Sequence, residues 1–212
     1  MPLDLFSLLA PTHTALVTSE IQRGVLGDLS ALPELAREGR RIVPNIARLV
    51  TEARARGVRV IHCTAFHRAD GFGANKNARL FSYMAKAANK MAPGSPQQEI
   101  VREVPVAESD LVLPRIHGLS PFHGTELDFV LRNEGITTIV GVGVSVNIAI
   151  QNLTFDAVNA GYQVVLPTDA TAGTPREYAE QVLEHTLRNV ATLASTEEVL
   201  AAWRSAQTRS TR

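Results

Sequence analysis

Apolar residues along the chain alternate between short, nearly continuous runs and longer stretches with helical spacing. The short runs are typical of strands buried on both faces, and the longer stretches are typical of helices with one apolar face. The expected strands span residues 14–20, 58–64, 110–114, 136–143, 162–169 and 191–195. The expected helices span residues 33–57, 76–90, 125–133, 146–160, 175–189 and 196–206. This alternation predicts a single-domain, doubly wound α/β fold, with a mainly parallel, six-stranded, Rossmann-like sheet and helices on both faces.

The length of 212 residues suits one such domain over residues 1–206, followed by a tail at 207–212 that is expected to be disordered. The formal net charge is zero, so the chain has no excess of positive charge for a nucleic acid or an anionic membrane. No apolar run approaches the length of a membrane span, and no secretion signal is expected. The one cysteine, Cys63, excludes a disulfide framework. A cytoplasmic protein that binds neither nucleic acid nor membrane is therefore expected.

The ends of the expected strands indicate where to look for a site. In open, parallel α/β sheets, ligands bind beyond the carboxyl ends of the strands. Five segments follow the first five expected strands: 19–23, 64–68, 115–122, 143–149 and 168–174. Polar side chains with catalytic or binding capacity are therefore sought in these segments first.

Two local motifs come close to known functional loops, and each lacks a required residue. Gly141–Gly143 reads GVG, but the dinucleotide fingerprint needs a third glycine where Val146 stands. GVSVN carries Asn147 in place of the last glycine of a nucleophile elbow, and GLSPF fails in the same way. A serine nucleophile at Ser145 or Ser120 would also need a histidine base, and no spacing pairs one with either serine. Neither a nucleotide site nor a serine triad is favoured.

His62, Cys63 and His67 lie together near the end of one expected strand. His62 and Cys63 are neighbours in that strand and point to opposite faces, so they cannot share a metal ion. Both are interpreted as core residues. His67 lies past the strand end and could line a pocket.

Four segments, in order and at matching distances, resemble the isochorismatase-like hydrolase superfamily, also called the cysteine hydrolases. They are SEIQ (19–22), SPFHGTELD (120–128), ITTIVGVGVSVNIAI (136–150) and NAGYQVVLPTDATAG (159–173). The resemblance extends from about residue 14 to residue 200, and it implies the same doubly wound fold.

In that family the catalytic set is Asp, Lys and Cys, and the matching positions here hold Glu20, Ile116 and Ala149. Alanine has no lone pair, so thiol chemistry at position 149 is impossible. Glu20 keeps a carboxyl group, extended by one methylene, that can still exchange a proton. Without the lysine, burial of Glu20 would favour its protonated form, unless Arg115 supplies a cation instead.

The isochorismatases proper carry glycine at the cysteine position and cleave a vinyl ether without a covalent intermediate. By resemblance, Glu20 could act as acid or base while water attacks, with Arg115 or His117 as a charge or substrate partner. The family also implies a non-proline cis peptide at Val144–Ser145 that helps aim the backbone N–H groups of Ser145 and Ala149 at an oxyanion. A helix that begins near Val146 would add its positive dipole end.

Gln22, His67, Phe122 and Asn147 are further candidates for contact with the substrate, although packing would explain each of them equally well. The metal site of nicotinamide-hydrolysing relatives needs an Asp two positions before a His, and Ala65 stands there before His67. Neither a metal nor another cofactor is therefore expected. Family members are usually oligomers, so a homo-oligomer, dimer or larger, is expected by resemblance.

The sequence thus favours a hydrolase of a small metabolite that acts without a cysteine nucleophile, with the bond type, C–O or C–N, left open. An alternative is a catalytically inactive homologue that binds a small molecule or serves in assembly. A further alternative is an amidohydrolase in which Ala149 is an engineered replacement for cysteine, against which Glu20 and Ile116 argue.

Overall fold

The computed structural model describes residues 4–86 and 91–210, whose strands form one parallel sheet with the order β3-β2-β1-β4-β5-β7. Its strands are β1 (Thr14–Ser19), β2 (Arg59–Ala65), β3 (Leu111–Arg115), β4 (Thr138–Val144), β5 (Gln163–Pro167), β6 (Thr171–Ala172) and β7 (Thr192–Ala194). The predicted α/β class and parallel sheet are confirmed. The seventh strand, β6, was not predicted because two residues beside the end of β4 are too few to form a hydrophobic run.

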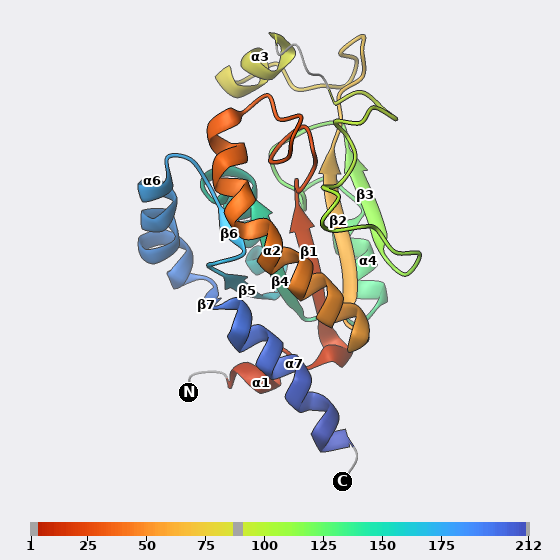
Figure 1. The fold of residues 1–212 in the computed structure, drawn as a ribbon, viewed down its shortest axis with the longest axis vertical. Coiled ribbons are helices and arrows are strands. Elements are labelled where there is room, and N and C mark those ends of the chain that lie inside the picture. The colour runs from red at the N-terminus through yellow and green to blue at the C-terminus, as the bar shows by residue number, and fades with distance from the viewer. Residues whose placement is uncertain (1–3, 87–90, 211–212) are drawn as a thin grey trace.

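Helices cover both faces of the sheet, as predicted. They are α1 (Leu5–Leu8), α2 (Pro33–Ala55), α3 (Arg79–Lys86), α4 (Leu127–Asn133), α5 (Gln151–Asn159), α6 (Arg176–Gln181) and α7 (Thr196–Ser210). Short 3₁₀ and π segments are η1 (Pro11–His13), η2 (Val146–Ile150), η3 (Val182–Thr186) and η4 (Leu187–Asn189). One apolar cluster joins α1, α2 and α7 to the sheet, and a second joins α4, α5 and α6 to its other face. Figure 1 shows α3 apart from both layers, beyond the carboxyl ends of the strands.

Several helix boundaries differ from the prediction. The expected helix 146–160 begins with the π turn η2, and the expected helix 175–189 divides into α6, η3 and η4. The expected helix 76–90 is shorter at its start as α3, and residues 87–90 lie outside the described residues. α7 continues to Ser210, beyond the expected helix end at residue 206, and residues 211 and 212 of the expected tail lie outside the described residues. Within the described ranges, no helix is long and apolar enough to cross a membrane.

The glycines of the GVG motif serve close packing between strands. Gly143 has a φ of 108°, and a Cβ added there would lie 2.2 Å from the carbonyl oxygen of Ser19 on the neighbouring strand. A Cβ at Gly141 would lie 3.1 Å from Leu166. Only glycine lets β1 and β4 approach so closely at this point, which lies at the carboxyl ends of both strands.

Gly143→Ala is therefore expected to lower the free energy of unfolding by about 3 kcal/mol or more, because it adds both a backbone clash and an unfavourable φ. Gly57→Ala is the matched control, since Gly57 also has a positive φ, 73°, but nothing lies within 4 Å of an added Cβ. That change should cost only about 1–2 kcal/mol. Urea unfolding of both variants checks the difference, and equal losses would contradict the packing role of Gly143.

A buried polar network joins α2, β1, β2 and the turn before β3. His62 is fully buried, and its Nδ1 lies 2.9 Å from Thr18 Oγ1, while its Nε2 lies 3.3 Å from Asp110 Oδ2. Arg54 forms an ion pair with Asp110, with Nε 3.0 Å from Oδ1. Burial lowers the pKa of His62, and the positive charge of Arg54 acts in the same direction, against the opposing effect of Asp110. The prediction of a core role for His62 is confirmed.

This network makes stability depend on pH. The unfolded chain binds a proton at histidine below a pH of about 6.5, where folded His62, with its lowered pKa, resists protonation. The free energy of unfolding should therefore fall as pH falls, by up to about 1.4 kcal/mol per pH unit for this group. His62→Gln removes the titrating group, so urea midpoints at about pH 7.5 and 5.5 should differ less in the variant than in the original protein. Equal differences would contradict the assignment.

Candidate active site

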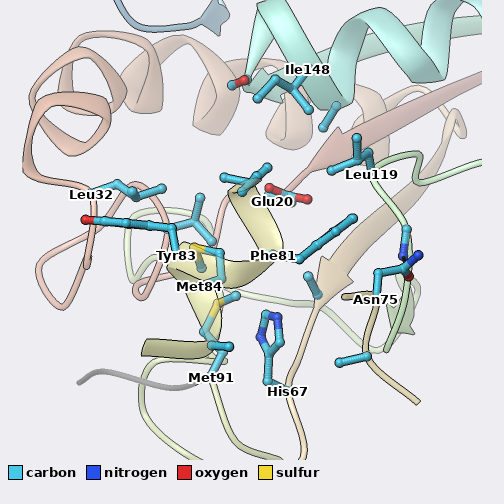
Figure 2. Close-up of a pocket in the computed structure, with 18 of the residues that line it drawn as sticks. Glu20, Leu32, His67, Asn75, Phe81, Tyr83, Met84, Met91, Leu119 and Ile148 are labelled. Carbon is cyan, nitrogen blue, oxygen red and sulfur yellow. Dashed lines mark hydrogen bonds between the residues drawn. The ribbon is translucent and has the colours of Figure 1, made fainter. Parts of the chain in front are cut away.

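A cavity of about 570 Å³ lies beyond the carboxyl ends of the strands. All five segments that follow the first five expected strands contribute to its lining. The first turn of α2 and the helix α3 supply further walls. Figure 2 shows Glu20 near the centre of this space, with Ile148 and Leu119 on one side and Phe81 and Met84 on the other.

Glu20 follows β1 directly and points into the cavity (Figure 2). Its φ of 52° is the only positive φ of a non-glycine residue in the described ranges, and this conformation is unfavourable for a glutamate. Such a backbone persists only where the surroundings hold it, and strained residues cluster at functional sites. The amide of Glu20 donates to the carbonyl of Cys63 at 2.9 Å, which holds the turn against β2.

Arg115, the last residue of β3, forms an ion pair with Glu20 across the sheet edge. The side chain of Arg115 is 5% exposed and that of Glu20 is 19% exposed, so the pair lies at the floor of the cavity. The expectation that Glu20 has no close cation is therefore wrong, and Arg115 supplies the cation, which was the open alternative. Ile116, at the position where the family has lysine, lines the cavity without any charge. The buried Nε and Nη1 atoms of Arg115 have no hydrogen-bond partner among the described residues.

The turn after β4 forms the wall beside this pair. The Val144–Ser145 peptide bond is cis, as the resemblance implied. Ser145, Asn147 and Ala149 all line the cavity, and the π turn η2 carries the last two. The amides of Ile148 and Ile150 both donate to the carbonyl of Ser145, at 3.0 Å each. A π turn within a helix is rare and is frequent at functional sites.

Cys63 is not a relocated nucleophile. It is buried in β2, 2% exposed, and it does not line the cavity. Burial raises the pKa of its thiol to about 12, and the charge of Glu20 adds to this against the opposing effect of Arg115. A thiol of this kind is not a thiolate near neutral pH, so it is inert as a nucleophile.

Two of the four predicted substrate contacts lie outside the cavity lining. Gln22 is fully buried, and its Nε2 donates to the carbonyls of Ala65, at 2.8 Å, and Gln98, at 3.0 Å. It fixes the cavity wall without reaching the space inside. Phe122 is buried in the core, where its ring packs edge-on against Tyr162 at 5.8 Å between centroids. For both residues the packing explanation is the one that the geometry supports.

The other polar candidates are brought together. His67 and Asn147 line the cavity, as does His117. Ser145 Oγ donates to Asn147 Oδ1 at 3.2 Å, and Asn147 Nδ2 donates to the carbonyl of Thr174 at 3.3 Å. Ser120 Oγ donates to Asp156 at 2.5 Å, which ties a loop to α5. Both serine hydroxyls therefore have partners other than a histidine base, in agreement with the absence of a triad motif.

Sequence reasoning missed the apolar wall of the cavity. The missed residues have apolar or aromatic side chains and line the same cavity as Glu20: Leu32, Leu80, Phe81, Tyr83, Met84, Met91, Leu119 and Ile148. Four of them lie on α3. The amphipathic pattern of α3 could have indicated this wall. Apolar side chains on one face of a helix outside the core are expected to contact another surface or to line a cavity.

Within the described ranges, no group of three or more His, Cys, Asp or Glu side chains lies close enough to hold a metal ion. The described lining offers the backbone of the turn after β4 and these charged or titratable side chains: Glu20 with its partner Arg115, Glu34, Arg68, Lys76, His67 and His117.

Fold and site together define a doubly wound α/β protein with a candidate active-site cavity at the strand ends. Comparison with known proteins identifies the family. The model of the isochorismatase domain matches residues 14–198. The chain is 31% identical to a probable inactive nicotinamidase, At3g16190, of Arabidopsis thaliana, over 81% of this chain and 87% of that protein. It is 28% identical to the ureidoacrylate amidohydrolase RutB of Serratia proteamaculans, over 81% of this chain and 75% of that protein. The chain belongs to the isochorismatase family, whose members are hydrolases.

A solved structure supports the same fold. The cysteine hydrolase from Pseudomonas syringae pv. phaseolicola superposes with a TM-score of 0.77 at 24% identity, and the match covers 92% of this chain and 94% of that one. The resemblance read from the sequence motifs is confirmed for the family by the domain model and for the fold by this structure.

Proposed function

We propose that this chain hydrolyses a small metabolite without a cysteine nucleophile, using Glu20 as the group that moves the proton. The observation that carries the proposal is the Glu20–Arg115 ion pair at the cavity floor, in a site where Ala149 offers no nucleophile. The strained backbone of Glu20 supports it, because such a conformation is unfavourable unless the surroundings hold it.

The proposed chemistry needs only water, a carboxylate and backbone donors. The carboxylate of Glu20, paired with Arg115, accepts a proton from a water molecule as the water oxygen attacks the electrophilic carbon. The N–H groups of Ser145 and Ala149 stabilise the oxyanion that forms. Glu20 then gives the same proton to the leaving nitrogen or oxygen, the C–N or C–O bond breaks, and the carboxylate is restored. His117 and Asn147 would orient the substrate.

A hydrolysis screen read by mass spectrometry tests the proposal. The panel would contain isochorismate, small primary amides, N-carbamoyl compounds and lactams, each incubated with the protein and with buffer alone. We expect one class to give product only in the presence of the protein, and that class identifies the bond. No product across the whole panel would favour the second candidate.

The second candidate is an inactive homologue that binds a small molecule, and Ala149 is the observation that favours it. A relative with 31% identity carries the name of a probable inactive nicotinamidase. Against it stands the Glu20–Arg115 pair at the cavity floor, since a residue held in an unfavourable backbone conformation, as Glu20 is, is typical of a functional site.

A further inference from the structure

All three lysines of the chain lie in one short segment. Lys76, Lys86 and Lys90 occur there together with Arg79, and residues 71–98 contain no Asp or Glu. Lys90 lies outside the described residues. The rest of the chain has 17 basic residues against 21 acidic ones, so this segment is positive and the remainder is net negative. Such a separation of charge in a chain of zero net charge indicates a local surface for an anion.

The cations of the described part of this segment meet at one open hollow of about 590 Å³ on α3 and the turn before it. Its lining is almost entirely polar: Lys76, Asn77, Ala78, Arg79, Ser82, Tyr83 and Lys86. Four of these residues repeat at the i, i+3, i+4, i+7 spacing of a single helix face: Arg79, Ser82, Tyr83 and Lys86. No Asp or Glu of the described ranges lines the hollow. It therefore offers cations with hydroxyl and amide groups, and no negative charge.

The cations of the hollow have no acidic partners. Most arginines elsewhere in the described ranges form ion pairs, as Arg68 does with Asp70 at 2.6 Å. Lys76, Arg79 and Lys86 form none within those ranges, and the residues outside them include no Asp or Glu. All three side chains are exposed. An anion can therefore bind them without breaking an existing ion pair.

The hollow is distinct from the cavity that contains Glu20, and α3 contributes to both. Arg79 and Lys86 line the hollow and do not line the cavity. Glu20 and Glu34, the two carboxylates of the cavity lining, do not line the hollow. Lys76 lines both. Since α3 has no fully buried residue, core packing does not fix its position, and a ligand that contacts Arg79 and Lys86 together would hold the helix beside the cavity.

We propose that this hollow binds a small molecule with two or more linked phosphate groups, and that the bound molecule holds α3 in place. Lysine and arginine donate charge-assisted hydrogen bonds to phosphate oxygens. Arg79 and Lys86 are seven residues apart, which separates their backbones by about 10 Å along the helix and favours linked phosphates over a single one. An extended polyanion is disfavoured, because the rest of the chain is net negative. The proposal is independent of hydrolysis at Glu20.

Calorimetric titration with inorganic phosphate, pyrophosphate and tripolyphosphate tests the binding. Affinity should rise along this series, because negative charge is added at each step, and it should fall as salt is added. Arg79→Gln and Lys86→Gln should each weaken binding of tripolyphosphate by up to about fivefold, and the double variant by about tenfold or more. Arg40→Gln is the matched control and should leave binding unchanged. Arg40 is exposed on α2, has no ion pair among the described residues, and lines neither the hollow nor the cavity.

The same titration distinguishes the hollow from the cavity floor, where Arg115 has donor atoms without a partner among the described residues. An anion that bound Arg115 would bind more tightly to Glu20→Gln and equally well to Arg79→Gln and Lys86→Gln, and this result would overturn the proposal. Circular dichroism confirms that each variant is folded. If Glu20→Gln does not fold, the effects of Arg79→Gln and Lys86→Gln still locate the site, because neither residue lines the cavity.

Hydrogen exchange read by mass spectrometry tests the effect on α3. Tripolyphosphate should slow exchange over residues 79–86 and leave exchange over α6 unchanged, and the slowing should disappear in the double variant. Binding without slower exchange would overturn the proposed effect on the helix.

Three results would overturn the binding proposal itself. They are no binding of tripolyphosphate at millimolar concentration, equal weakening by Arg40→Gln and Arg79→Gln, and tighter binding of a DNA oligonucleotide or a phosphatidylserine vesicle than of tripolyphosphate. None of these measurements uses turnover, so failure of the hydrolase proposal would leave them unchanged.

Discussion

Glu20→Gln is expected to lower kcat/KM for the substrate found in the screen by about 10²–10⁴-fold, the range that general acid–base catalysis contributes. Glutamine has nearly the same shape, but its amide cannot accept a proton from water or return one to the leaving group. Glu20→Asp should keep part of the activity, because it retains the carboxyl group and differs by one methylene. Steady-state kinetics on the folded proteins, with product measured by mass spectrometry, checks this order.

Glu134→Gln provides the matched control for that result. Glu134 makes an exposed ion pair with Arg59, at 2.7 Å, and does not line the cavity. The same chemical change there should leave kcat/KM unchanged. Turnover by Glu20→Gln at the original rate would remove Glu20 from the mechanism, and an equal loss in Glu134→Gln would indicate a nonspecific effect.

Stability measurements should show strong coupling between Glu20 and Arg115. Each of Glu20→Gln and Arg115→Met is expected to lower the free energy of unfolding by about 3 kcal/mol or more, because each leaves a charge without its partner at the cavity floor. The loss should be larger for Glu20→Gln. In that variant Arg115, which is only 5% exposed, keeps its charge, and its Nε and Nη1 atoms already have no hydrogen-bond partner among the described residues.

The double variant distinguishes this coupling from two independent losses. Removing both charges leaves no unpaired ion, so the double variant should be more stable than the sum of the two single losses predicts, by at least about 1 kcal/mol. Urea unfolding of the original protein, both single variants and the double variant gives this coupling energy. If the loss in the double variant equals the sum of the two single losses, the coupling energy is close to zero and the ion pair does not stabilise the fold as a pair.

The sheet and the position of the site could be predicted because both depend on strong local signals. Continuous apolar runs placed the strands of the sheet, and the strand-end rule then selected segments that all reach the cavity. The turn that carries Ser145 and Ala149 was recognisable from its motif. Each of these features depends on the order of residue types over a short stretch of the chain, and a single sequence shows that order.

The contacts inside the site could not be predicted in the same way. Strand residues adjacent in the sequence point in different directions, so whether Arg115 or another residue met Glu20 depended on register and side-chain reach. Gln22 and Phe122 follow strand ends, but the side chain of Gln22 bonds to Ala65 at the end of β2, and that of Phe122 packs in the core against Tyr162. The apolar wall from α3 depends on how a long loop folds back over the strands, which local periodicity does not determine.

Cys63→Ala tests most directly whether hydrolysis proceeds without a thiol. Cys63 is the only cysteine in the chain, so the folded variant contains no thiol at all. The measurement is kcat/KM of this variant beside the original protein, on the substrate class that the screen identifies. We expect the two values to agree within about twofold, since the buried thiol, with its raised pKa, takes no part in the reaction. A folded variant that has lost turnover would contradict thiol-free hydrolysis at Glu20.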